Sequence, residues 1–376
     1  EINFICKYAT DRAEAMSKER KGGILIQDMH NIVEGALEQV NPAVAKSYRD
    51  YRNYKVDFIH MMDEVYTKSQ SIRYIGDKSN ANTDSALVAT KRSLIFNELN
   101  KELYRKFFMN RNELQACKDG YIYIHDQSAR LDTMNCCLFD VGSVLRGGFE
   151  MGNVWYNEPK TLDTAFDVMG DIILSTAAQQ YGGFTVPEVD KILSPYAQKS
   201  YNKYYEEFLK YSDPSWEGRE EKGRVYAWEK VCRDCDQGWQ GIEYKLNTVG
   251  SSRGDYPFVT VTLGLGTGRF EKMISKSLLK VHMGGQGKAG HKKPVLFPKI
   301  VFLYDEEIHG DGKECEDVFE TGVACSAKTM YPDWLSMSGQ GYISSMYKQY
   351  KKVISPMGCR AFLSPWYERG GMYPAD

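Results

Sequence analysis

Two adjacent thiols lie where a predicted strand begins. Cys136 and Cys137 are in the segment LDTMNCCLFD, just after a strand-like run that ends in His125 and Asp126. A thiol at such a position would point into the centre of a sheet or a barrel, where it could meet a substrate. Catalysis by a thiol and inert packing of a buried thiol are both compatible with these residues alone.

Another thiol, Cys359, lies at the predicted tip of a turn. In the segment SPMGCRAFL, Pro356 and Gly358 predict a tight turn, and Arg360 adds a positive charge beside the thiol. A nearby positive charge favours the reactive thiolate over the thiol. This arrangement indicates a functional thiol, with inert packing as the alternative.

The remaining cysteines show no comparable pattern. The chain has nine cysteines, an odd number, which argues against a complete disulfide framework and favours reduced thiols. Cys232 and Cys235 form a C-x-x-C pair, but no second pair lies nearby to complete four zinc ligands. We therefore expect no metal site within this chain.

Two glycine-rich segments invite comparison with phosphate-binding loops. HMGGQGKAGHKKP, at 282–294, fails the Walker pattern because His282 and Ala289 stand where Gly and Ser or Thr are needed. TLGLGTG, at 262–268, follows a predicted strand and precedes a predicted helix, so its backbone N–H groups could hold an anion. The second segment is therefore a candidate for phosphate contacts.

Composition and charge exclude several classes of protein. Of the 376 residues, 42% are hydrophobic and 26% are charged, which is typical of a globular protein with a sizeable core. The formal charge of −2 provides no electrostatic attraction for nucleic acid. No apolar run approaches the roughly 18 residues of a membrane helix, and no secretory pattern begins the chain, so we expect a cytoplasmic protein.

The pattern of apolar residues predicts alternating helices and strands. The first 55 residues have helical periodicity throughout. Beyond them, helices are predicted over 84–109, 161–180 and 196–211, and strands over Tyr121–His125, Cys137–Val144, Phe258–Leu265 and Pro294–Tyr304. Strands separated by helices of this length are typical of an α/β protein with a parallel sheet or a barrel.

Six segments together resemble the anaerobic, oxygen-sensitive class of ribonucleoside-triphosphate reductases, which are glycyl-radical enzymes. They are MNCCLFDVGSVLRGGFEMGN at 134–153, STAAQQYGG at 175–183, SYNK at 200–203, PFVTVTLGLGTG at 257–268, CSAKTMYPD at 325–333 and SPMGCRAFL at 355–363. They follow the family's order across most of residues 100–376. Residues 24–54 resemble the closing helices of the ATP-cone, a regulatory domain. The resemblance thus divides the chain into an ATP-cone-like part, 1–55, and the N-terminal and central part of the reductase barrel, 56–376.

The resemblance implies a ten-stranded α/β barrel, partly contained in this chain, and a radical mechanism. In the family, a thiyl radical on one face of the ribose removes the 3′-hydrogen, and a thiol on the opposite face helps the 2′-hydroxyl to leave as water. Cys136 matches the thiyl position, and Cys359 matches the opposite thiol, on a loop through the barrel centre. The residues expected to contact the substrate are Asn135, His125, Gly264, Gly266, Thr267, Met357 and Gly358.

The resemblance also implies cofactors and partners outside this chain. The family's radical glycine and the C-x-x-C pairs for structural zinc would fall beyond Asp376, so we expect these residues to be inactive by themselves. Forming the glycyl radical would require an activating iron–sulfur enzyme that uses S-adenosylmethionine. The reductant, formate or a protein dithiol, is left open.

Regulation by ATP and deoxynucleotide effectors is expected on the same grounds. The resemblance implies a homodimer in which an effector binds between the helices predicted over 161–180 and 196–211. Lys160 and Lys203 are the candidates for its phosphates, because an ammonium group on a helix surface suits a triphosphate. A solvated surface lysine is the alternative at both positions.

Two other functions stay open at this point. Cys136 and Cys137 resemble the cysteine pair of pyruvate formate-lyase-like enzymes, which pass a radical between neighbouring sulfurs. The separate MGCR segment argues against that function. The second alternative is a catalytically silent nucleotide-binding or regulatory protein that keeps the barrel.

Overall fold

Helices make up the first part of the chain. The computed structural model describes residues 1–20, 23–52, 59–60, 62–63, 87–124, 127–129, 134–358 and 362. In it, α1 (Ile2–Arg20) and α2 (Ile26–Val40) pack against each other, and residues 42–52 are helical as well. Next come α4 (Val88–Phe108), α5 (Arg111–Lys118) and the short 3-10 helix η1 (Gln127–Ala129). Among the described residues, no helix is both long and apolar enough to cross a membrane.

A sheet of five parallel strands forms the centre of the molecule. Its order, β1-β4-β5-β6-β7, is also the order along the chain. The strands are β1 (Cys137–Leu138), β4 (Phe184–Val186), β5 (Val259–Leu263), β6 (Lys299–Tyr304) and β7 (Asp333–Ser336). Every connection contains at least one helix, as parallel neighbours require. The predicted α/β class is confirmed, and the described residues show five parallel strands rather than a closed ten-stranded barrel.

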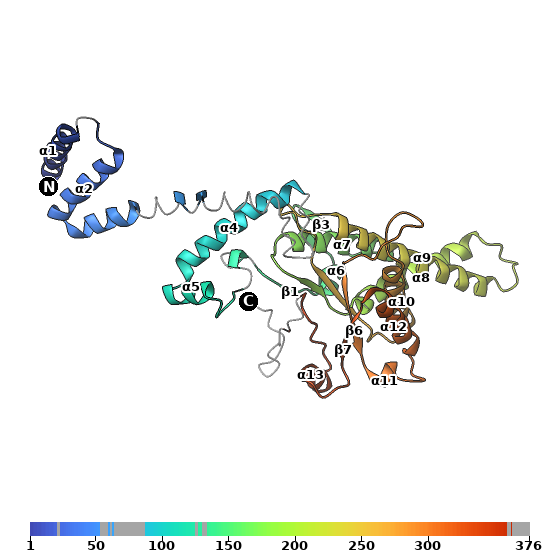
Figure 1. The fold of residues 1–376 in the computed structure, drawn as a ribbon. Helices are drawn as coiled ribbons and strands as arrows, with labels where there is room; N and C mark the ends of the chain where they lie inside the picture. Colours follow the sequence, from blue (N-terminus) through green and yellow to red (C-terminus); the bar gives the residue numbers. More distant parts are fainter. Residues whose placement is uncertain are drawn as a thin grey trace.

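Long helices cover one face of this sheet (Figure 1). They are α7 (Leu162–Ala178), α8 (Val189–Tyr211), α9 (Arg219–Thr248), α10 (Arg269–Gly284) and α12 (Glu316–Thr329). Their apolar sides form the main hydrophobic core with the strands, where Trp239 is fully buried against the ring of Phe166. α8 and α9 continue past the sheet as a projecting pair (Figure 1). The helices predicted over 161–180 and 196–211 are thus present as α7 and α8.

The strands present different residues to their two faces. On β4, Phe184 and Val186 join the main core, whereas Thr185 is buried on the other face. β5 alternates likewise, with Thr260 and Thr262 on the second face. Further along the sheet this second face is apolar and is covered by α13 (Tyr342–Tyr350). Because a buried hydroxyl needs a hydrogen-bond partner, the threonines mark where a polar segment must lie.

The strand predicted over Tyr121–His125 is not present in its described residues, 121–124. Tyr121 and Tyr123 are 83% and 86% exposed. No strand in the described part of the chain pairs with this segment. The alternation of residues therefore does not correspond to a buried face here. His125 lies outside the described residues.

The strand predicted over Cys137–Val144 is much shorter than expected. β1 ends at Leu138, and α6 (Val141–Leu145) begins after Asp140, whose carboxylate accepts the N–H of Ser143 at 3.0 Å. An aspartate cap of this kind favours the start of a helix over a continued strand. An antiparallel hairpin of β2 (Phe149–Met151) and β3 (Val154–Tyr156) then precedes α7.

Candidate active site

Cys136 lies directly before β1, against two glycines that precede β4. Its Sγ accepts the N–H of Gly183 at 3.2 Å and lies 3.7 Å from Oδ1 of Asn135. A Cβ built on Gly182 would lie 2.6 Å from this sulfur, so a methyl group does not fit there. The thiol is partly exposed. Glycine at these positions is therefore what lets the thiol reach this edge of the sheet.

A segment from the far end of the chain crosses the second face of the sheet. Near the end of β5, Ser355 Oγ lies 3.3 Å from Thr262 Oγ1, and these residues are 93 positions apart. On β4, Thr185 Oγ1 donates to the carbonyl of Pro356 at 3.1 Å, across 171 positions. Met357, which follows, is buried. The polar groups expected beside the buried threonines are therefore the Ser355 hydroxyl and the Pro356 carbonyl, both in segment 355–358.

This segment ends beside Gly182 and Gly183, the glycines that contact the Cys136 thiol. A Cβ built on Gly183 would lie 2.7 Å from Cα of Gly358, so the two backbones are in close contact. Pro356 forms an antiparallel bridge with Phe362, so the chain reverses direction between them, as the predicted turn requires. Cys359 itself lies outside the described residues.

Cys137 has surroundings different from those of its neighbour. Its side chain packs against the main hydrophobic core, and burial raises its pKa to about 11. Such a thiol is protonated and unreactive at neutral pH. The two adjacent thiols thus have different environments, as the alternation of side chains along a strand predicts.

The glycine-rich loop 264–268 lies at the edge of the sheet formed by the carboxyl ends of the strands, whereas Cys136 lies at the edge formed by their amino ends. Phe258 touches Gly183 at the thiol's edge. From Phe258 to Gly264 the chain spans about 20 Å, at about 3.3 Å per residue. The structure therefore does not bring Gly264, Gly266 and Thr267 together with the thiol.

The N–H groups of the three glycines in this loop have partners within the chain. Those of Gly264 and Gly266 donate to Oδ2 of Asp190 at 3.0 and 3.3 Å, and that of Gly268 donates to Glu271. Asp190 is fully buried, and this burial raises the pKa of its carboxyl. An internal carboxyl group thus occupies the position that the sequence suggested for a bound anion.

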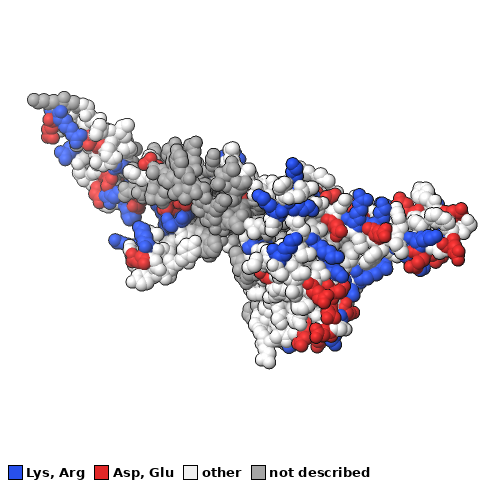
Figure 2. Space-filling model, turned by 45° about the vertical axis from the view of Figure 1, so that its right-hand side comes forward, with Lys and Arg blue, Asp and Glu red and all other residues white. Residues whose placement is uncertain are grey.

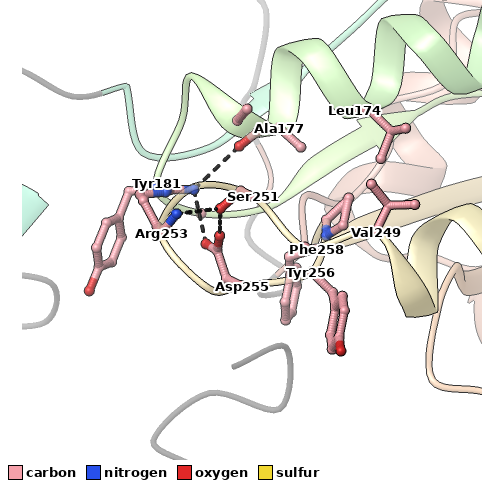
Figure 3. Close-up of a pocket in the computed structure, with 13 residues that line it drawn as sticks. Leu174, Ala177, Tyr181, Val249, Ser251, Arg253, Asp255, Tyr256 and Phe258 are labelled. Carbon is pink, nitrogen blue, oxygen red and sulfur yellow. Dashed lines mark hydrogen bonds and ion pairs between the residues drawn. The ribbon is translucent and has the colours of Figure 1, made fainter. Parts of the chain in front are cut away.

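A cavity of about 140 Å³ lies at the same edge as Cys136 (Figure 3). Its wall includes Gly182, which touches the thiol, and Arg253 from the loop before β5. Arg253 forms an ion pair with Asp255 at 2.9 Å and donates to the carbonyl of Ala177 at 3.3 Å, as Figure 3 shows. Its buried Nε has no partner among the described residues. Arg253 is not among the predicted site residues, and an arginine in the loop that precedes a buried strand is the signal that could have found it.

The two lysines expected at an effector site are both exposed. Lys160 precedes α7, and Lys203 lies on α8 with its Nζ 5.8 Å from the ring centre of Tyr204. Basic and acidic side chains are mixed along the projecting α8–α9 pair (Figure 2). Within the described ranges, no group of three or more His, Cys, Asp or Glu side chains is arranged to hold a metal ion.

Known proteins provide an independent comparison. A family model described as anaerobic ribonucleoside-triphosphate reductase matches residues 79–373. The anaerobic ribonucleoside-triphosphate reductase of Escherichia coli (strain K12) is 31% identical over 97% of this chain and 50% of the relative. The enzyme of the same name from Enterobacteria phage T4 is 36% identical over 78% of this chain and 46% of the relative.

The chain spans about half the length of the curated relatives it matches. Its fold is similar to that of the anaerobic ribonucleotide reductase from Thermotoga maritima with glycerol in the active site, with a TM-score of 0.51. That likeness has 14% identity over 77% of this chain and 50% of the other, and so concerns the fold alone. The match of the family model over 79–373 shows that the chain belongs to the anaerobic ribonucleoside-triphosphate reductase family.

Proposed function

We propose that the protein of which this chain forms part reduces ribonucleoside triphosphates to 2′-deoxyribonucleoside triphosphates through a thiyl radical. The observation that carries the proposal is the contact of two distant segments with one pair of glycines. Cys136 packs on Gly182 and Gly183, and Gly358, the residue before Cys359, packs on Gly183. This contact supports a site with two thiols supplied by two different segments.

Cys136 and Cys359 would act on opposite faces of one ribose. A ribose C–H is too weak an acid for a side-chain base at neutral pH, so a sulfur radical removes the 3′-hydrogen as an atom and becomes a thiol. The other thiol gives a proton to the 2′-hydroxyl, which leaves as water. Replacing this hydroxyl with hydrogen consumes two electrons and two protons, which formate or a protein dithiol would supply. The unpaired electron comes from a glycyl radical elsewhere in the protein, formed by an activating iron–sulfur enzyme with S-adenosylmethionine.

The cavity beside Gly182 is our candidate for the part of the nucleotide that extends beyond the ribose. Arg253 in its wall carries a guanidinium group, and such a group suits an oxygen of a phosphate or a base. Asn135, next to the thiol, is a candidate contact for the ribose. The loop 264–268, predicted to contact the substrate phosphates, follows β5 and lies at the other edge of the sheet from Cys136.

We further propose a homodimer in which effectors bind beside α7 and α8. Lys160 and Lys203 are exposed near these helices and would contact effector phosphates. Residues 1–55 would form the end of an ATP-binding regulatory domain. The match to the E. coli relative covers 97% of the chain and so includes most of these residues. Structural zinc would bind elsewhere in the protein.

The lyase-like alternative needs both adjacent sulfurs at the site. Cys137 instead packs against the hydrophobic core, with a pKa raised by burial to about 11. This difference makes Cys137 a matched control for Cys136.

The test compares Cys136→Ser with Cys137→Ser in the full-length protein, activated anaerobically by its iron–sulfur partner. We expect Cys136→Ser to lose at least about a thousandfold in deoxynucleotide formation, because a serine hydroxyl cannot replace the thiol in radical or proton transfer. Cys137→Ser should stay within about threefold of the wild type. Both variants should still show the glycyl radical by electron paramagnetic resonance. Equal activities of the two variants, or full wild-type activity in air without the partner, would overturn the proposal.

A further inference from the structure

Two buried threonines hold the segment that leads to the second thiol. Thr185 on β4 donates its hydroxyl hydrogen to the carbonyl of Pro356 at 3.1 Å. Thr262 on β5 accepts the N–H of Glu188 at 2.8 Å, and its Oγ1 lies 3.3 Å from Oγ of Ser355. Both threonines are 0% exposed, and Ser355 is 1% exposed. These bonds therefore form away from solvent.

The chemistry of the groups fixes the direction of one of these bonds, and in the other either hydroxyl can donate. A carbonyl oxygen only accepts, so Thr185 is the donor to Pro356. Because the N–H of Glu188 already points at Oγ1 of Thr262, the hydroxyl hydrogen of Thr262 is available for Ser355. Two successive residues of the segment are thus attached to two neighbouring strands. Two such attachments define both where the segment lies and in which direction it runs.

Packing alone does not require threonine at either position. The strands read FTV at 184–186 and VTVTL at 259–263, so apolar residues flank both threonines. Valine has the shape of threonine and suits a strand equally well. Burying a hydroxyl costs free energy unless it is hydrogen-bonded. The hydroxyls, rather than the shape of the side chain, therefore distinguish these positions.

We propose that Thr185 and Thr262 are positioning residues that set the register of segment 355–358 on the sheet, and thereby the position of Cys359 relative to Cys136. The inference rests on the proposed function and deepens it. The segment ends with Gly358 against Gly183, beside Cys136, and Cys359 is the next residue in the chain, so a shift in the register of the segment also displaces the residue bonded to it. A misplacement of about 1 Å at a reacting atom costs about a hundredfold in rate.

The experiment measures kcat and KM of Thr185→Val and Thr262→Val in the full-length, activated protein. We expect kcat to fall about 10- to 100-fold while KM stays within about threefold, because the threonines place a reacting group and do not touch the substrate. Thr185→Ser and Thr262→Ser keep the hydroxyl and should restore most of kcat. The glycyl radical signal should be the same in all variants.

Ser200→Ala provides the matched control. The Ser200 hydroxyl is also fully buried and accepts the N–H of Leu162 at 2.8 Å, but it lies in the helical layer. Its removal should lower stability and leave kcat within about threefold. Wild-type kcat in both valine variants would overturn the proposal, and so would a loss that Ser200→Ala shares and serine does not restore.

Two further measurements keep the proposal open to refutation. If a valine variant does not fold, Ser355→Ala removes the partner hydroxyl from the segment instead of the sheet and should lower kcat in the same way. If the wild type forms no deoxynucleotide, the proposed function fails, and amide hydrogen exchange over 353–358 then decides whether the threonines hold the segment. Exchange there should be faster in Thr262→Val than in Ser200→Ala, and equal rates would refute the anchoring role.

Discussion

The two edges of the parallel sheet use glycine for different purposes. At the edge where β4 begins, the missing side chains of Gly182 and Gly183 leave room for the thiol and for segment 355–358. At the edge where β5 ends, Gly264 has a φ of +119°, which other residues rarely adopt, and its N–H donates to Asp190. Glycine thus permits close approach at the first edge and an unusual backbone conformation at the second.

This difference is the reason why we place the proposed ligand site at the first edge. The loop 264–268 has the more familiar glycine-rich sequence, yet Asp190 and Glu271 already accept the N–H groups of its glycines. The edge beside Gly182 has a cavity of about 140 Å³ with Arg253 in its wall. Glycine content indicates tight backbone geometry, and the partners of the N–H groups decide whether a ligand site results.

The largest effect is expected at the first edge. In Gly183→Ala the new Cβ would lie 2.7 Å from Cα of Gly358, so segment 355–358 must move. Deoxynucleotide formation by the activated full-length protein should fall about a hundredfold, since Cys359, the proposed second thiol, directly follows this segment. Gly241→Ala on α9, where a Cβ meets nothing within 4 Å, is the control and should keep full activity. Equal activities of the two variants would show that close approach at Gly183 is not required.

An intermediate effect is expected at the second edge, and on stability rather than activity. In Gly264→Ala the strained φ of +119° is combined with a Cβ 3.0 Å from the carbonyl oxygen of Leu303. We expect the free energy of unfolding in urea to fall by about 1–3 kcal/mol. Gly147→Ala, with a φ of +78° and no neighbour within 4 Å, should cost less. A larger cost at Gly147 would contradict this account of the loop.

The smallest effect is a pH dependence at the second edge. His309 ends the short helix α11 (Glu306–His309), and its Nε2–H donates to the carbonyl of Gly264 at 2.9 Å. Burial lowers the pKa of His309, so the unfolded chain binds this proton more readily than the folded protein. The histidine's contribution to stability is therefore complete above its unfolded pKa of about 6.5 and is lost as the pH falls toward the folded value.

His309→Gln keeps an N–H donor and removes the titration. Between about pH 7.5 and pH 5.5, its free energy of unfolding should fall less than that of the wild type. Burial raises the pKa of Asp190, which gives the opposite slope, but this residue is present in both proteins and its effect cancels in the comparison. A wild type and a variant with the same pH slope would show that His309 does not titrate on unfolding.

The helices and strands predicted from periodicity are present in the structure where another element packs against them. β5 lies within the predicted strand Phe258–Leu265, and helix α7 matches the prediction over 161–180, because both contribute an apolar face to the same core. The alternating run at 121–124 has no partner strand in the described part of the chain, and the one after Leu138 is interrupted by the cap at Asp140. Periodicity predicts which face of an element would be buried, but that face is buried only where another strand or helix packs against it.

The sequence alone was enough to predict the α/β class, the two thiol segments and the turn after Ser355. Each of these depends on neighbours within a few positions. The alternation in VTVTL also places Thr260 and Thr262 on one face of their strand, and the register of the structure adds Thr185 to that face. Only the tertiary structure decided that Gly183 touches both Cys136 and the segment 355–358, and that Thr185 bonds to a residue 171 positions away. Contacts at such separations depend on how the parallel strands pair and on where the chain returns across the sheet, and neither is contained in local periodicity.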